Sequence, residues 1–159
     1  MQHQNISMFT ECSNRLCGCK AIRDYVLGGR GVFTLESPTG KSRTYTFRYP
    51  SDDLFDDDDY YQNAMFVYAK TSNGRWMYVG MYLNGKFTLT EASRFPNSHP
   101  IVKGVRYLLR MMQDEQRAAG PMIVRHEGVC CVCGRKLTSS KSILSGVGPK
   151  CRGVRRCRS

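Results

Sequence analysis

The residues in this sequence best suited to chemistry are its eight cysteines, three of which have the spacing of metal ligands. Cys130 and Cys133 form a Cys-x-x-Cys-Gly motif. It places two thiolates on one tight turn, where the following glycine lets backbone amides point at sulfur. Cys151 comes just after Gly-x-Gly-Pro, and proline is favoured at a helix start. The pattern predicts a treble-clef-like zinc finger: a knuckle, a hairpin and a short helix that donates the third ligand to a tetrahedral Zn²⁺.

The fourth ligand has two candidates. His126 lies four residues before Cys130 and would complete a Cys₃His set, which we favour. Cys157, in the C-terminal tail, would instead complete Cys₄. Cys131 adjoins a ligand and is expected to point away from the metal. The alternative, ordinary buried cysteines, is weaker because several motifs agree. A catalytic zinc would keep an open position, and no general base other than Glu127 is evident nearby.

A second group of cysteines lies near the N-terminus: Cys12, Cys17 and Cys19. They could hold a second metal, or complete a site with Cys157, but their spacing is a weak signal. Free thiols are the favoured interpretation. Clustered cysteines in a reducing compartment are more often metal ligands than disulfides.

The charge of the chain indicates a polyanionic partner. There are 24 Lys and Arg against 13 Asp and Glu, a net charge of +11. From Met122 onward the sequence has nine basic residues and one acidic residue, so this segment alone carries a net charge of +8. Nucleic acid is the commonest partner of such a surface. The predicted nucleic-acid contacts are Arg135, Lys136, Lys150, Arg152, Arg155, Arg156 and Arg158. The alternative is a solvated end that aids solubility.

An acidic run, Asp52–Asp59, interrupts the basic body. Mutual repulsion favours an exposed loop. Aromatic residues flank the carboxylates, which suits a protein interface, so Asp56, Asp57, Asp58 and Tyr60 are predicted to bind a partner protein. The simpler interpretation is a flexible loop with no partner.

The remaining pattern predicts an α+β fold, with an antiparallel β-meander sheet and one or two packed helices before the finger. Alternation and turn signals predict strands at 32–37, 42–49, 64–70, 75–83 and 86–91, with Asn-Gly turns in the last two hairpins. Helices are predicted at 14–27 and 100–119. Residues 1–121 would form a β-rich domain, and residues 122–159 the finger module with its basic tail.

Aromatic residues recur with strand periodicity at Tyr45, Phe47, Tyr49, Trp76, Tyr78 and Tyr82. An exposed sheet face that combines aromatic and basic side chains can stack unpaired bases. We favour instead that these residues pack beneath the helix at 100–119, because a single sheet needs one apolar face buried.

The cysteine motif resembles a short zinc-finger family of unknown function found in bacteriophage and bacterial proteins. The resemblance lies in Cys-x-x-Cys-Gly-Arg-Lys-Leu-Thr followed by Ser-Ile-x-x-Gly-x-Gly-Pro-x-Cys, over about residues 126–152. A looser match covers 21–30, 32–41 and Tyr78-Val-Gly, as in members where a β-rich segment precedes the finger. The resemblance implies zinc and a phage or mobile-element setting. It implies no activity, and the arginines after Cys151 lie outside the motif.

Enzyme motifs are missing: the sequence has no Gly-x-Ser-x-Gly, no phosphate-binding loop and no His-Glu-x-x-His. No signal peptide or membrane-spanning run is visible, so the host-cell cytoplasm is the expected location. We therefore predict a non-enzymatic, nucleic-acid-binding zinc-finger protein. The alternative is a phage-encoded inhibitor or adaptor that captures a host defence or nucleic-acid-handling protein through residues 52–61.

Overall fold

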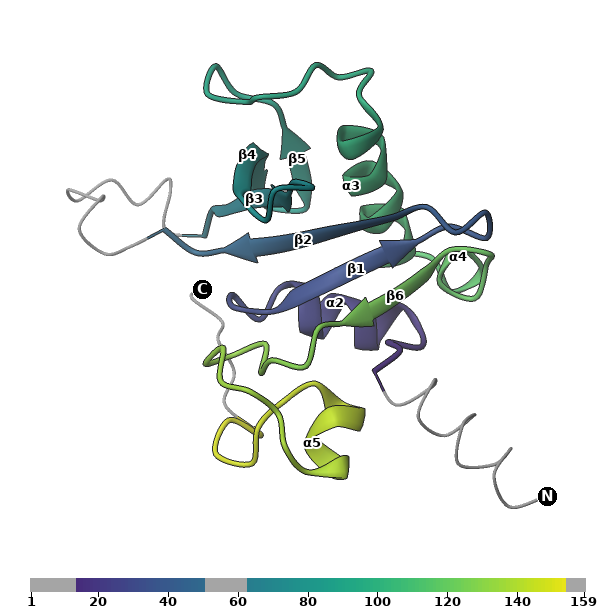
Figure 1. The fold of residues 1–159 in the computed structure, drawn as a ribbon, viewed down its shortest axis with the longest axis vertical. Helices are drawn as coiled ribbons and strands as arrows, with labels where there is room; N and C mark the ends of the chain where they lie inside the picture. Colours follow the sequence, from purple (N-terminus) through teal and green to yellow (C-terminus); the bar gives the residue numbers. More distant parts are fainter. Residues whose placement is uncertain (1–13, 51–62, 154–159) are drawn as a thin grey trace.

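A six-stranded antiparallel sheet organises the chain in the computed structural model, which describes residues 14–50 and 63–153 (Figure 1). Its strand order is β5-β4-β3-β2-β1-β6. In chain order the elements are α2 (Cys19–Val26), β1 (Val32–Glu36), β2 (Ser42–Arg48), β3 (Met65–Lys70), β4 (Trp76–Leu83), β5 (Lys86–Thr88), α3 (Pro100–Met111), α4 (Glu115–Ala118), β6 (Ile123–His126) and α5 (Ser140–Ser145). The α+β class predicted from the sequence is confirmed.

The first five strands form the predicted meander, since each pairs with the next along the chain. The turn between β4 and β5 has positive φ at Asn84 (51°) and Gly85 (80°), as its Asn-Gly sequence predicts. The sequence predicted five strands, and the sheet has six. Residues 123–126, which the sequence assigned to the finger module, form β6 beside β1, with Leu35 opposite Val124. The structure does not test the proposed division into two domains, but the predicted module begins inside the sheet.

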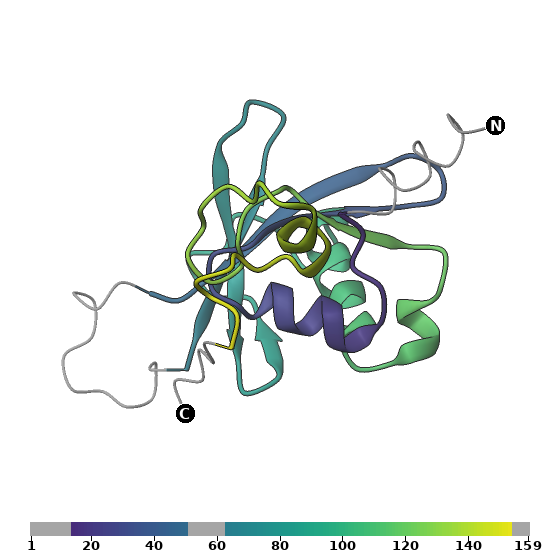
Figure 2. The same cartoon turned by 90° about the horizontal axis from the view of Figure 1, so that it is seen from below.

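Helices α2 and α3 lie on the same side of β1 and β2 (Figure 2). The strand residues that face them are buried, including Phe33, Tyr45 and Phe47. Tyr45 also donates a hydrogen bond to the carbonyl of Ile101 in α3, at 2.9 Å. A Cβ at Gly104 would come within 2.3 Å of the Tyr45 hydroxyl, so glycine permits this close helix–sheet contact. Tyr45 and Phe47 thus pack under the helices, as favoured from the sequence. For Trp76 the same prediction is wrong, because its side chain is exposed.

Both predicted helices are shorter than expected. The first starts at Cys19, because residues 14–16 pair with β6 instead: the Leu16 amide donates to the Val124 carbonyl at 2.9 Å. The second divides into α3 and α4 at Asp114, whose carboxylate accepts from the Gln116 amide and so caps a new helix. In the two described ranges no helix combines the length and apolar character required to span a bilayer.

Candidate metal centre

The side chains of Cys130, Cys133 and Cys151 converge at one point below the sheet. Their Sγ atoms all lie within 4.8 Å of one another. A tetrahedral zinc–thiolate centre with Zn–S bonds of about 2.3 Å would place its sulfurs about 3.8 Å apart. The spacing and the soft donor set therefore fit a metal ion, and the three cysteines predicted to act together are found together.

A short hairpin positions the first two cysteines. The Cys130 amide donates to the Arg135 carbonyl at 2.8 Å, and the Leu137 amide donates to the Gly128 carbonyl at 2.8 Å. At the tip, the Gly134 amide donates to the Cys130 carbonyl at 2.9 Å, with φ of 76° at Gly134. That left-handed conformation favours glycine, which explains the Cys-x-x-Cys-Gly order.

Helix α5 lies between this hairpin and the third cysteine. Its N-cap is Ser139, whose hydroxyl accepts from the Ser142 amide, and it ends at Gly146 with φ of 73°. Cys151 follows in a turn, where its amide donates to the Gly148 carbonyl at 3.0 Å. The sequence predicted a helix starting at the third ligand. Residues 154–159, over which that helix would run, lie outside the described residues, so it stays a prediction. Helix α5 precedes Cys151, and a treble-clef arrangement is not shown.

The hairpin and the Gly148 turn both direct backbone N–H groups at the sulfur of Cys130. Gly148 donates at 3.3 Å and Val132 at 3.4 Å. Burial alone would raise the pKa of Cys130, but these donors outweigh it and bring that pKa to about 7. Desolvation and hydrogen bonding to Cys133 and Cys130 raise the pKa of Cys151 to about 11. One thiolate therefore forms readily here, and a bound cation would be needed to stabilise all three.

His126, the favoured fourth ligand, is not part of the three-cysteine group. Its Nδ1 accepts from the Gly128 amide at 3.0 Å, and its Nε2 donates to the Ile143 carbonyl at 2.6 Å. Burial lowers its pKa and so favours the neutral ring. Both ring nitrogens are already used, so His126 here connects β6 to α5. The other candidate, Cys157, lies outside the described residues.

Cys131, which was expected to point away from the metal, is not among the three clustered cysteines. It is buried, and burial raises the pKa of its thiol to about 12. Its carbonyl accepts from the Arg30 amide at 3.0 Å. A Cβ at Gly28 would lie 2.5 Å from that same oxygen. Cys131 therefore serves as a contact between the hairpin and the loop after α2.

Of the three N-terminal cysteines, the structure describes Cys17 and Cys19. Cys17 is exposed and Cys19 half-buried, and the described ranges contain no further set of three clustered metal-ligating side chains. The Cys19 amide donates to a Glu115 carboxylate oxygen at 3.1 Å, so α4 caps α2. Cys12 lies outside the described residues.

Tyr25, which sequence reasoning missed, joins the cysteine segment (residues 128–153) to the sheet body (residues 14–50 and 63–127). Its hydroxyl donates to the Val129 carbonyl at 2.6 Å, and its ring stacks on His126 with centroids 5.4 Å apart. A Cβ at Gly146 would lie 2.6 Å from that ring. No local pattern in the sequence signals this role, because the carbonyl that Tyr25 contacts lies about a hundred residues further along the chain.

Basic side chains lie along the cysteine segment. Arg135, Lys136, Lys141, Lys150 and Arg152 are all exposed, and residues 128–153 contain no Asp or Glu. Arg152 donates to the Ser142 hydroxyl at 3.1 Å. The other predicted contacts, Arg155, Arg156 and Arg158, and the predicted partner-binding residues Asp56, Asp57, Asp58 and Tyr60, lie outside the described residues.

Comparison with known protein families gives a match in the cysteine segment. A family model described as a family of unknown function (DUF6011) matches residues 123–156. The match covers β6, the hairpin, α5 and all three clustered cysteines, and leaves most of the sheet unmatched. Its description assigns no metal, ligand or activity. No curated protein and no solved structure matches the chain.

Proposed function

We propose that this chain is a small, non-enzymatic zinc-finger protein that binds nucleic acid through its basic C-terminal module. The observation that supports it is the surface around the cysteine cluster. Five exposed cations lie within residues 128–153, where the sequence has no carboxylate to neutralise them. A phosphate backbone is the ligand best matched to such a surface.

Zinc is the proposed metal because three thiolates on a turn-rich segment suit its tetrahedral sulfur chemistry. Its role is structural. It would fix the hairpin relative to α5 and so hold Arg135 and Lys136, on the second strand of the hairpin, in a constant orientation to Arg152. The fourth ligand would come from Cys157 or from a rearranged His126. The match to a family of unknown function is compatible with this role and adds no activity.

A salt titration tests the proposal. Five phosphate contacts should give a slope of log K against log salt of about −4.5 on duplex DNA, and a shallower slope on single strands. Fluorescence anisotropy with labelled duplex and single-stranded oligonucleotides measures both. An affinity that does not change between low and high salt would refute nucleic-acid binding by this surface.

A matched pair of double variants locates the contact. Arg135→Gln with Lys136→Gln should reduce affinity for every oligonucleotide and lower the salt slope by about two. Lys86→Gln with Arg110→Gln removes the same charge from exposed positions on β5 and α3, and should leave binding nearly unchanged. Equal losses in the two variants would mean that net charge, and not this module, attracts the polyanion.

The alternative is an inhibitor or adaptor that binds a host defence or nucleic-acid-handling protein through Asp56, Asp57, Asp58 and Tyr60. The six carboxylates of residues 52–59 favour it, since they could mimic phosphate on a basic groove. Protein purified with zinc but without co-purifying nucleic acid would support this alternative. Deletion of residues 52–59 should then abolish capture of the host protein.

A further inference from the structure

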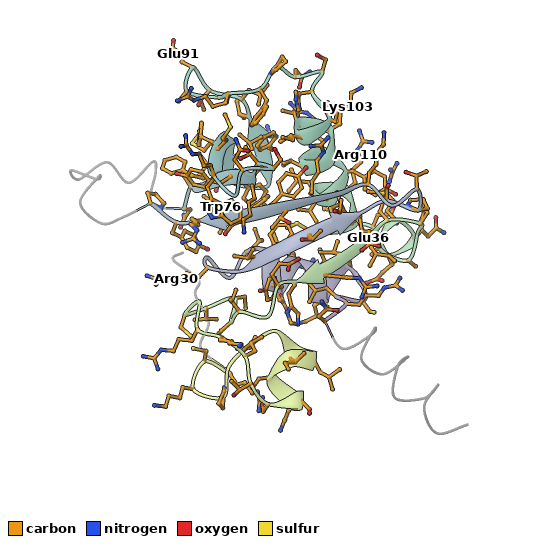
Figure 3. The ribbon with its side chains drawn as sticks, viewed as in Figure 1. Arg30, Glu36, Trp76, Glu91, Lys103 and Arg110 are labelled. Carbon is orange, nitrogen blue, oxygen red and sulfur yellow. The ribbon has the colours of Figure 1, made fainter. Side chains whose placement is uncertain are left out.

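Strands β2, β3 and β4 have a second face, opposite the helices. Along β3 the side chains of Met65, Val67 and Ala69 are buried, while those of Phe66, Tyr68 and Lys70 alternate with them and remain accessible. The register continues this face across β4, where Tyr68 pairs with Tyr78 and Lys70 with Trp76. Figure 3 shows Trp76 on the sheet, well separated from the cysteine segment.

Aromatic rings gather on this face. The Tyr78 ring lies 5.9 Å from Phe66 and 5.8 Å from Tyr68, and both pairs are T-shaped. The Thr90 hydroxyl donates to the Tyr78 hydroxyl at 3.1 Å, which fixes the central ring. Trp76, the one tryptophan of the chain, is 37% exposed. Edge-to-face packing holds these rings in place while leaving ring surface open to solvent.

Cations border the rings. The Lys70 ammonium lies 5.9 Å from the Trp76 ring, and Arg48 on β2 is exposed and paired in register with Phe66. Strands β2, β3 and β4 contain no Asp or Glu. Within these three described strands the face therefore combines open aromatic surface with positive charge, a combination that an acidic, ring-bearing ligand would match.

We propose that this face, defined by Arg48, Phe66, Tyr68, Lys70, Trp76 and Tyr78, binds single-stranded nucleic acid. Unpaired bases would stack on the aromatic rings, and Arg48 and Lys70 would contact the phosphates. A duplex would use only the cations, because its bases are already stacked on one another. The inference rests on the proposed function for the class of ligand, but it assigns a separate site on the sheet body.

The test compares full-length zinc-loaded protein and variants on two probes: a 15-nucleotide oligothymidine and a duplex of equal length. Stacking is worth about 5- to 150-fold per base, so Trp76→Ala should weaken oligothymidine binding by at least about fivefold and duplex binding by less than twofold. Lys70→Ala should weaken both. Oligothymidine should also quench the fluorescence of Trp76, which reports on this face alone.

Two controls separate this site from the C-terminal module. Tyr107→Leu removes a half-buried aromatic ring on α3, away from the face, and should leave oligothymidine affinity unchanged. Arg135→Gln with Lys136→Gln should weaken both probes without removing the quenching at saturation. If the Arg135→Gln, Lys136→Gln variant lost binding while Trp76→Ala kept an oligothymidine affinity within twofold of wild type, the sheet site would be overturned. The proposal for the C-terminal module would then still hold. Equal binding of polyglutamate and oligothymidine would also overturn it.

Discussion

The sheet body and the cysteine segment differ in what holds their side chains in place. In the body, Phe33 is fully buried among three aromatic rings, with centroids 6.5 Å from Tyr25, 6.3 Å from Tyr45 and 6.0 Å from Phe47. The cysteine segment has one hydrogen-bonded hairpin and one six-residue helix. Apart from cysteines, its buried apolar side chains are Val132 and Leu137.

The difference indicates two sources of stability in one chain. A cluster of large aromatic rings removes enough apolar surface from water to stabilise a sheet without a cofactor. Residues 128–153 bury too little for that, and small segments of this kind commonly depend on a metal. The body should therefore keep its fold when the proposed metal is removed, and the cysteine segment should not.

Metal removal gives the largest expected effect. Structural zinc contributes about 10–16 kcal/mol in isolated finger peptides, so chelation should unfold the cysteine segment. Hydrogen exchange should then become fast at the amides of Cys130, Gly134 and Leu137, and stay slow at Phe33 and Val67. Hydrogen-exchange mass spectrometry measures both regions in one sample, and re-added zinc is the control. Simultaneous loss of protection in the body would contradict the view that the two regions have separate sources of stability.

A cavity made in the sheet body tests whether its aromatic cluster is the main source of its stability. Phe33→Ala should destabilise the whole protein by about 3–5 kcal/mol, because no solvent reaches this ring and its neighbours cannot fill the space. Urea denaturation followed by circular dichroism measures the loss. Phe66→Ala, on the accessible face of the sheet, is the control and should cost clearly less. Similar losses in the two variants would mean that the aromatic cluster is not the main source of stability.

The sequence predicted correctly those features whose signal lies within one short segment. Strand alternation and the Asn84-Gly85 turn predict the β4–β5 hairpin, since both signals lie within a few residues. The three clustered cysteines follow from their spacing for the same reason. Such local patterns predict the structure because the contacts that they depend on form within the same segment.

The sequence did not predict features that depend on contacts with residues far away along the chain. Strand β6 is four residues long, and it exists because β1 and residues 14–16 pair with it across about a hundred residues of chain. The ligand role predicted for His126 used spacing alone. The carbonyl of Ile143 and the amide of Gly128 occupy its two nitrogens, and nothing in the spacing could reveal them.

The junction between the two regions should respond to the loss of a single hydroxyl group. Tyr25→Phe removes the donor to the Val129 carbonyl at 2.6 Å, together with a longer contact to the Val32 carbonyl at 3.3 Å, and keeps the ring that stacks on His126. A typical intramolecular hydrogen bond contributes about 0.5–1.5 kcal/mol, and this one is half-buried. We expect weaker zinc retention against a competing chelator and little change in the urea midpoint of the body. Tyr107→Phe, on the surface of α3, is the matched control. A lowered body midpoint without a change in zinc retention would place Tyr25 in the body's core and not at the junction.

The smallest expected effect lies inside the cysteine segment, at the N-cap of α5. The Ser139 hydroxyl accepts from the Ser142 amide at 3.2 Å, and Ser139→Ala should cost about 1 kcal/mol. That loss corresponds to about fivefold weaker zinc binding, because folding of α5 and formation of the cluster are coupled through the Gly148 turn. Ser140→Ala, at the exposed first residue of the same helix, should leave affinity unchanged or slightly improved, since alanine is the better helix former. If Ser139→Ala instead lowered the stability of metal-free protein by the same amount, α5 would be folded before the metal binds, and the cysteine segment would depend less on its cluster than its sparse core indicates.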